Sequence, residues 1–168
     1  MDSRIKKLAS GLVNYSCGVK EGDKVYIHHI GKDTKDLARQ LVKDVYAAKG
    51  IPFVHYTEPQ VQREVLLHAT KEQMELMAEV DSLEMSKMDC YIGVRGSDNV
   101  SELSDVPADR MALYDTYYQT PVHHGIRVPK TRWWCCAIPM RPWHSFPAPV
   151  WRPLKIFILT YVRWTTPG

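Results

Sequence analysis

The sequence predicts an α/β domain in which helices cover both faces of a mostly parallel sheet, a Rossmann-like three-layer sandwich. Short β-branched segments alternate with amphipathic helical segments through the first part of the chain, and turn residues separate them. Because strand–helix–strand units form right-handed crossovers, these strands pair in parallel. We expect one domain over residues 1–132 and an irregular, non-native tail without a fold of its own over residues 133–168.

The chain begins with a helix, a strand and a second helix. Residues 3–16 carry apolar side chains at three- and four-residue spacing, which predicts an amphipathic helix. The run 24–30 (KVYIHHI) is short, β-branched and mostly apolar, as in a buried strand. Asp33 or Thr34 is the expected cap of the second helix, which has one apolar stripe and ends at Ala48.

Gly50 occupies the position of a left-handed C-cap after the second helix. Residues 51–56 (IPFVHY) predict the second strand, in which a proline near the start is tolerated. Pro59 suits the first turn of a short helix that runs toward His68.

A capping box marks the start of the next helix. Thr70 and Gln73 have the spacing at which side chain and backbone cap each other, so we expect a helix over residues 71–86. Three apolar side chains of this helix are expected to face inward: Met74, Met77 and Val80. Residues 88–94 (MDCYIGV) then predict the third strand.

A polar loop is expected over residues 95–106, and Pro107 suits the first turn of the helix that follows. Aromatic and apolar residues come after this proline at helical spacing: Met111, Leu113, Tyr114, Tyr117 and Tyr118. Residues 131–133 look like the start of a fourth strand, and the pattern of the domain stops there.

Charge and composition exclude several classes of protein. Residues 1–132 hold 18 basic and 19 acidic side chains, and a nearly neutral body argues against nucleic-acid binding. No apolar run approaches the roughly 20 residues that span a bilayer, and the charged first residues do not form a secretory leader. We therefore expect a cytoplasmic protein that binds neither nucleic acid nor membranes.

The last 36 residues have a different composition. They hold all five tryptophans and six of the eleven prolines, and none of the nineteen Asp and Glu residues. Natural surfaces carry both signs of charge, on about a quarter of their residues. Residues 155–162 (KIFILTYV) combine high β-propensity with no acidic neighbour, so we expect poor solubility that improves on truncation near Arg132.

Open parallel sheets place ligand sites at the carboxyl ends of their strands. Three groups of residues occupy those ends in the prediction: His28-His29, Tyr56-Thr57-Glu58 and Gly93–Asn99. The loop Gly93–Asn99 is the best candidate, because its glycines permit close backbone approach and Arg95 can meet a carboxylate or phosphate. It matches neither the dinucleotide-binding nor the Walker pattern, and a structural turn is the alternative interpretation.

The remaining polar clusters favour structural roles. The pairs His28-His29 and His123-His124 each place neighbouring rings on diverging sides of a strand or helix, which disfavours a metal site. Adjacent Cys135 and Cys136 match no disulfide or zinc spacing, so metal or redox chemistry is the less favoured interpretation there.

Two sets of side chains recur at helical spacing. The tyrosines of the first set are interpreted as core or interface residues: Tyr114, Tyr117 and Tyr118. The glutamates of the second set are interpreted as a solvated helix face: Glu72, Glu75 and Glu79. No pair of a nucleophile and a base stands out in the sequence. We therefore assign no catalytic, cofactor-binding or metal-binding residue.

Three long segments carry a family resemblance. They are LVNYSCGVKEGDKVYI (12–27), VKDVYAAKGIPFVHY (42–56) and the stretch from Tyr56 to Trp133, in which the loop 93–107 and the ending RVPKTRW match most specifically. With this order and spacing, the chain up to Trp133 resembles the amino-terminal domain of the thermophilic metallo-aminopeptidases, the aminopeptidase T and aminopeptidase S family.

The resemblance implies a hydrolase that releases amino-terminal residues from peptides. In that family a later domain holds two divalent metal ions, of the zinc or cobalt type, with glutamate, histidine and aspartate ligands, a catalytic glutamate and a tyrosine. Two bridged metals generate a hydroxide and stabilise the tetrahedral intermediate. None of those motifs has a matching position here, so we carry over no catalytic residue and expect no cofactor in this fragment. The family's first domain helps to build a dimer, which implies a homodimer.

The genetic code offers an explanation for the tail. Family members continue after this tryptophan with a strand of the form Trp-Val-Val-Leu-Arg-Tyr-Pro, which TGG GTG GTG CTG CGC TAT CC encodes. Loss of one G gives TGG TGG TGC TGC GCT ATC C, which encodes residues 133–138 and begins Pro139. Read one base earlier, codons allowed for residues 140–168 also encode a family-like segment that restores acidic residues. We therefore expect a frameshifted tail.

These observations predict a truncated member of a metal-dependent aminopeptidase family, without the metal-binding catalytic domain and inactive alone. Two alternatives stay open. One is a small stand-alone α/β module that binds an anionic small molecule through the Gly93–Asn99 loop. The other is an interaction protein that pairs with an intact relative through the family's dimer surface.

Overall fold

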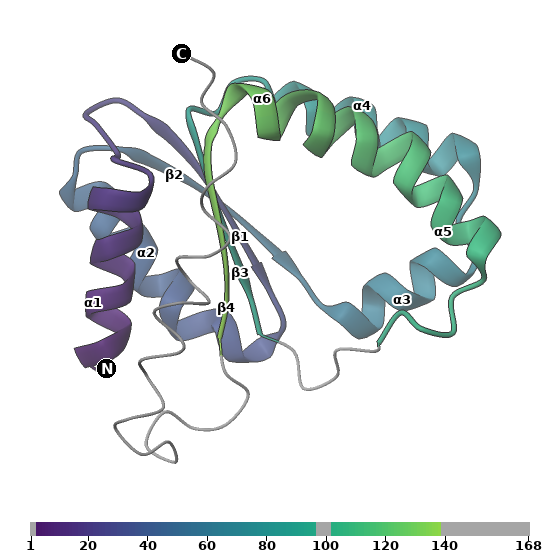
Figure 1. Cartoon of the computed structure of the whole chain (residues 1–168), viewed down its shortest axis with the longest axis horizontal. Coiled ribbons are helices and arrows are strands. Elements are labelled where there is room, and N and C mark those ends of the chain that lie inside the picture. The colour runs from purple at the N-terminus through teal and green to yellow at the C-terminus, as the bar shows by residue number, and fades with distance from the viewer. Residues whose placement is uncertain (1–2, 97–101, 139–168) are drawn as a thin grey trace.

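A computed structural model describes residues 3–96 and 102–138 of the chain. Within these ranges, one parallel sheet has the strand order β2-β1-β3-β4, and helices lie on both of its faces, so the predicted α/β sandwich is confirmed (Figure 1). The strands are β1 (Lys24–Ile30), β2 (Ile51–Thr57), β3 (Cys90–Arg95) and β4 (Arg132–Ala137). The predicted first strand has the observed bounds, and the second and third shift by one or two residues.

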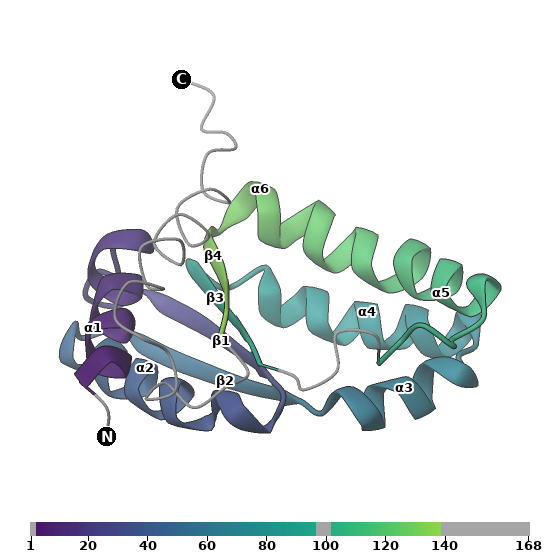
Figure 2. The same cartoon turned by 60° about the horizontal axis from the view of Figure 1, so that its bottom comes forward.

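The helices form two layers (Figure 2). On one face lie α1 (Ser3–Gly11), its π-helical continuation η1 (Leu12–Ser16) and α2 (Lys35–Ala47), which follows the short 3-10 helix η2 (Lys32–Thr34). The other layer contains α3 (Pro59–Leu67), α4 (Lys71–Met85), α5 (Ala108–Tyr114), the π-helix η3 (Asp115–Arg127) and α6 (Val128–Lys130). No helix in the described ranges is long and apolar enough to cross a membrane.

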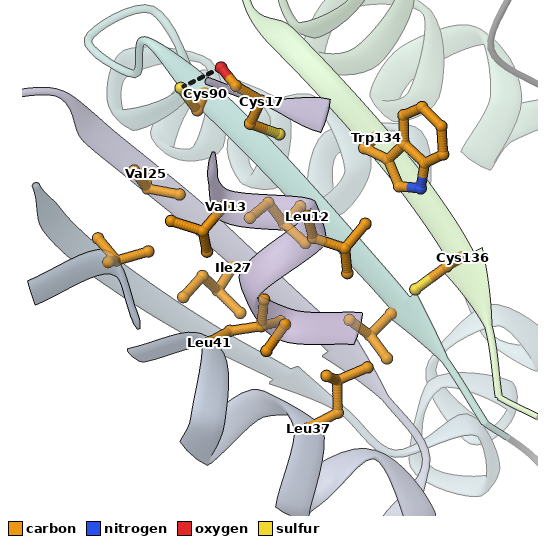
Figure 3. Packing of buried hydrophobic residues seen from close by; sticks show 14 of the residues in the cluster. Leu12, Val13, Cys17, Val25, Ile27, Leu37, Leu41, Cys90, Trp134 and Cys136 are labelled. Carbon is orange, nitrogen blue, oxygen red and sulfur yellow. Dashed lines mark hydrogen bonds between the residues drawn. The ribbon is translucent and has the colours of Figure 1, made fainter. Parts of the chain in front are cut away.

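The face of the sheet beneath α1 and α2 is aliphatic and forms the main core (Figure 3). Alternate residues of each strand point to this face, so a single hydrophobic surface runs across the sheet. Fully buried side chains of the sheet and of the helices η1 and α2 meet there: Val13, Val25, Ile27, Leu37, Leu41, Val45, Ile92 and Val94. Burial of each such side chain contributes about 1.5–3 kcal/mol, which makes this cluster the principal source of stability.

Strand β4 crosses the predicted boundary between domain and tail. Its ladder with β3 extends from Arg132 to Ala137, and the Ile138 N–H donates to the Arg95 carbonyl oxygen at 2.8 Å. Trp134 and Ile138 are 6% and 8% exposed in the aliphatic core. The start of the predicted tail therefore belongs to the sheet, whereas residues 139–168, including 155–162, lie outside the described part of the chain.

Two capping details differ from prediction. The left-handed residue after α2 is Lys49, with φ of 61°, and not Gly50. Gly50 is required for space instead, because an added Cβ would lie 2.9 Å from a methyl group of Val19. Thr34 precedes α2 without a side-chain cap, because its hydroxyl donates to the Gly31 carbonyl oxygen at 2.6 Å.

Helix α4 confirms its predicted cap but not its predicted inward face. The Thr70 hydroxyl oxygen accepts from the Gln73 N–H at 3.2 Å. Met74 is buried, but Met77 and Val80, which were expected inside, are 37% and 61% exposed. The stripe that faces the protein consists instead of Met74, Ala78 and Met85, spaced by four and seven residues.

The helix after Pro107 is longer than its sequence suggested. It continues without interruption through α5, η3 and α6 to Lys130, although Pro121 lies inside it. In a π-helix each N–H bonds to the carbonyl five residues earlier, and the Thr120 hydroxyl bonds in the same way to the Asp115 carbonyl oxygen at 2.8 Å. This long helix carries the chain back to the start of β4.

Candidate functional site

The carboxyl ends of all four strands meet at one edge of the sheet, as the prediction required. Backbone hydrogen bonds draw the following loops together there: the Gly31 N–H donates to Thr57 and the Gly96 N–H donates to Ile30, at 3.0 and 2.9 Å. An added Cβ on Gly96 would lie 3.0 Å from the Thr34 methyl group. In the described part of the chain, the loops that follow β1, β2 and β3 therefore pack tightly against one another at the carboxyl ends of the strands.

The two neighbouring histidines of β1 point to opposite faces, as predicted. On the aliphatic side, His29 Nδ1 lies 2.9 Å from the hydroxyl of Thr34, and its ring packs against Tyr56. Thr34 is fully buried, so this contact and the bond to Gly31 provide its hydroxyl with partners. Burial lowers the pKa of His29 below its usual value.

His28 lies on the other face, within a cluster that the sequence did not predict. We call this cluster the aromatic layer, and it contains His28, Tyr91, His123 and Arg127. The His28 Nδ1 is 3.1 Å from the Tyr91 hydroxyl and its Nε2 is 2.8 Å from the Thr57 hydroxyl. Burial, followed by the electrostatic influence of His123, His55, His29 and Arg95, lowers the pKa of His28 to about 4. His28 is thus a neutral hydrogen-bonding group at physiological pH.

The helix η3 contributes the opposite wall of this layer. The Arg127 Nε–H donates to His123 Nδ1 at 2.9 Å, and the guanidinium lies 4.9 and 4.8 Å from the Tyr91 and Trp133 ring centres. Burial, then the charge of Arg127, lowers the pKa of His123 to about 4. The neutral ring is required as the acceptor, so the arrangement binds β3, β4 and η3 together.

The preferred candidate loop, Gly93–Asn99, is only partly described. Gly93 lies within β3, where an added Cβ would be 2.9 Å from the Cys135 Sγ. Its need for glycine therefore comes from packing against β4. Arg95 ends the strand with an exposed side chain, Gly96 is buried, and residues 97–99 lie outside the described part. The described half of the loop contains one exposed cationic side chain, that of Arg95, and no set of backbone N–H groups arranged to bind an anion.

A metal site is not supported by the described residues. Among residues 3–96 and 102–138, no group of three or more His, Cys, Asp or Glu side chains is placed to hold an ion. Cys135 is exposed and Cys136 is buried, on opposite faces of β4, so they do not form a pair. The nitrogens of His28 are occupied by hydroxyl contacts. The donors present do not fit the two-metal centre that the resemblance implies.

The other polar clusters of the sequence have structural positions. Tyr114 and Tyr118 stack at 5.2 Å between ring centres, and the Tyr118 hydroxyl donates to Asp81 at 2.6 Å, which confirms a core role. His124 is exposed while His123 is half-buried, so that pair diverges as expected. The three predicted surface glutamates of α4 are exposed: Glu72, Glu75 and Glu79.

An open groove of about 470 Å³ lies between α4 and η3. It is lined by side chains of both helices: Glu75, Ala78, Glu79, Ser82, Thr116, Tyr117, Thr120 and Pro121. Sequence patterns did not reveal it, because its lining residues on the two helices are 34 or more positions apart in the sequence and no local pattern connects them. Its two carboxylates belong to no group of three or more His, Cys, Asp or Glu side chains placed to hold an ion within residues 3–96 and 102–138.

Comparison with known proteins agrees with the fold and the family resemblance. The sequence model of the thermophilic metalloprotease family (M29) matches residues 1–150. Wild-type AmpT from Thermus thermophilus has a similar structure, with a TM-score of 0.62, 18% identity and coverage of 94% of this chain. The present chain spans 42% of the AmpT chain. No curated protein matches. With most of its length matched by the family model, the chain belongs to the thermophilic metalloprotease family M29.

Proposed function

We propose that this chain is the amino-terminal part of a metal-dependent aminopeptidase whose reading frame slips at the codons for Trp133 and Trp134. The intact enzyme releases amino-terminal residues from peptides with two divalent metal ions, of the zinc or cobalt type, in a later domain. The chain as it stands lacks those ligands and is inactive alone. We further place it in the cytoplasm, because the cysteines of its described part are free thiols.

One observation carries this proposal. From residue 133 onward the sequence contains no acidic residue and all five tryptophans, and codons allowed for residues 133–139 encode the family's strand once one base is inserted. The preceding residues match the family in order and spacing.

The environment of Trp134 supports the same proposal. Its indole lies in an otherwise aliphatic and sulfur-containing core, and its buried Nε1 has no hydrogen-bond partner among the described residues. A buried N–H without a partner costs about 1–3 kcal/mol, and buried tryptophans in selected cores usually find an acceptor. The restored frame places valine at this position, which fits the aliphatic surroundings. The family model matches residues 1–150 and thus extends beyond the proposed slip. The argument for the slip comes from the composition of residues 133–168 and does not use that match.

The proposal is tested by sequencing the gene around codon 133 and by restoring one G there. Both proteins, the chain as given and the restored product, are purified and incubated with Zn²⁺ or Co²⁺. Hydrolysis of a chromogenic amino-acid amide and bound metal per chain are then measured. We expect turnover and bound metal for the restored product only.

Two outcomes overturn the proposal. Stoichiometric metal binding with turnover by the chain as given means that the active site lies within these residues. A restored frame that encodes neither acidic residues nor a family-like segment removes the basis for the slip.

A further inference from the structure

The π-helix η3, which runs between α5 and α6 in Figure 2, is held to the domain by little apolar burial. Hydrogen bonding of the π type is rare in proteins and usually lasts for a single turn, whereas η3 extends over 13 residues and contains Pro121. Val122 is the one residue of η3 that is buried. A segment with so few buried apolar contacts belongs to the low end of local stability within a fold.

The side chain of Arg127 anchors the last turn of η3 to two strands. Its guanidinium lies 4.9 Å from the ring centre of Tyr91 on β3 and 4.8 Å from that of Trp133 on β4. Its Nε–H donates to Nδ1 of His123, four residues earlier on the same helix, at 2.9 Å. The Arg127 Nη1 is buried and has no hydrogen-bond partner among the described residues. The bond to His123 is therefore the contact that orients this half-buried guanidinium.

This bond requires a neutral ring on His123. A protonated imidazole carries an N–H on each of its nitrogens, so it would set a second donor against the Arg127 Nε–H. It would also bring two positive charges to within 2.9 Å of each other in half-buried surroundings, where their repulsion is poorly screened. Burial and the charge of Arg127 lower the pKa of His123 to about 4, in agreement with this geometry.

The titratable groups around the His123–Arg127 pair do not offset an added positive charge. The groups that are neutral or basic come from β1, β3, β4 and η3: His28, Tyr91, Cys135, Tyr118 and His124. Helix α4 contributes the carboxylate of Asp81, which accepts from the Tyr118 hydroxyl at 2.6 Å. Among the residues that the structure describes, no carboxylate contributes to the proton affinity of His123.

We propose that η3 is an acid-released segment of this fold. Protonation of His123 breaks its bond to Arg127, the guanidinium leaves the rings of Tyr91 and Trp133, and η3 separates from the sheet. The fold thereby converts a fall in pH into exposure of the aromatic layer. The trigger is one ring, and the segment that moves is the one with the least buried apolar surface to retain it.

The helices α1 and α2 on the opposite face stay packed when η3 is released. The core beneath them is built from side chains that do not titrate in this pH range, such as Leu41 and Ile92. His29 is the histidine of β1 on that side, and it lies half-buried beside Tyr56, outside the aliphatic cluster. Acid therefore acts on one layer of the sandwich before the other.

Hydrogen–deuterium exchange of the full chain at pH 7.5 and pH 5, read by mass spectrometry, tests the proposal. Protection factors are compared, because division by the intrinsic exchange rate removes the effect of pH on exchange itself. If His123 regains its ordinary pKa of 6.5 when η3 opens, proton linkage lowers the protection of η3 amides by at most about 30-fold over this interval. The amides of α1 and α2 should lose less than about threefold.

Two variants assign the effect to the pair. His123→Gln keeps a carbonyl oxygen that can accept from Arg127 but does not titrate, so its η3 protection should fall by less than about threefold. Arg127→Leu removes both the donor and the charge, so η3 should be less protected already at pH 7.5 and should respond to acid much less than the parent does. The matched control is His124→Gln, at the exposed neighbouring ring, which should keep the parent's response.

Three outcomes overturn the inference. Equal losses of protection in η3, α1 and α2 mean that acid unfolds the domain as one unit. Unchanged protection of η3 means that the segment is not released, and a loss in His123→Gln as large as that of the parent means that this ring is not the trigger. These measurements do not depend on peptidase activity, so this inference and the proposed function fail separately.

Discussion

Acid should destabilise the domain through two half-buried histidines, His28 and His123, and the size of the effect follows from their pKa values. Burial lowers the pKa of His28 and of His123 from 6.5 to about 4. In the unfolded chain these rings regain their ordinary pKa, so the unfolded state binds more protons between pH 6.5 and 4. The stability contribution is therefore complete above pH 6.5 and is lost as the pH falls toward 4.

The difference between the ordinary pKa of 6.5 and the value of about 4 for His28 corresponds to at most about 3.4 kcal/mol. Proton linkage places about 2 kcal/mol of that loss between pH 7.5 and pH 5. The contributions of the two histidines do not add, because both rings contact Tyr91 and the charge of one acts on the other.

Urea unfolding followed by circular dichroism at pH 7.5 and pH 5 measures this effect. His28→Gln retains hydrogen-bonding groups toward Tyr91 and Thr57 but does not titrate. Its free energy of unfolding should fall by about 2 kcal/mol less than that of the parent over this interval. His124→Gln, at an exposed ring, serves as the control and should keep the parent's slope. An unchanged pH slope in the double variant His28→Gln/His123→Gln would refute the reasoning.

Three further predictions concern β4 and its surroundings. Trp134→Val should change the free energy of unfolding by less than about 1 kcal/mol in urea titrations, because removal of an unpartnered N–H offsets lost apolar burial. Ile92→Ala on the same face should cost about 2–5 kcal/mol, and a comparable loss for Trp134→Val would contradict the idea that the site is aliphatic. Gly93→Ala should destabilise the domain by about 1–3 kcal/mol, since its Cβ would meet the Cys135 Sγ at 2.9 Å, and Cys135→Ala should recover part of that loss in a thermal-melt double-mutant cycle. Truncation after Ile138 should raise the soluble yield while the melting temperature is kept, whereas truncation before β4 should lower the melting temperature; equal yields of full and shortened chains would count against an aggregating tail.

The sequence predicted the order of strands and helices because each local pattern agreed with the tertiary fold. The strand 24–30 and the capping box at Thr70 are examples in which period and cap chemistry suffice. The prediction failed where a neighbour decided the outcome. Met77 and Val80 are apolar and were assigned to the core, but the helices and strands that pack against α4 select the buried stripe.

The aromatic layer was missed for a similar reason. His28, Tyr91, His123 and Arg127 come from two strands and one helix that are far apart in the sequence, and no local pattern connects them. Their adjacency follows from the strand order and from the length of η3.

Strand β4 is positioned mainly by main-chain contacts. Its first N–H bonds to Asp89, the side chain of Arg132 reaches Asp23 and the Gly18 carbonyl oxygen, and the parallel ladder then fixes six successive residues. A ladder of this kind recognises the polypeptide backbone, which every reading frame supplies alike. A shift in translation at this point would therefore be accommodated for one strand before its consequences reach the fold, and such a gene could still yield a compact remnant that escapes immediate degradation.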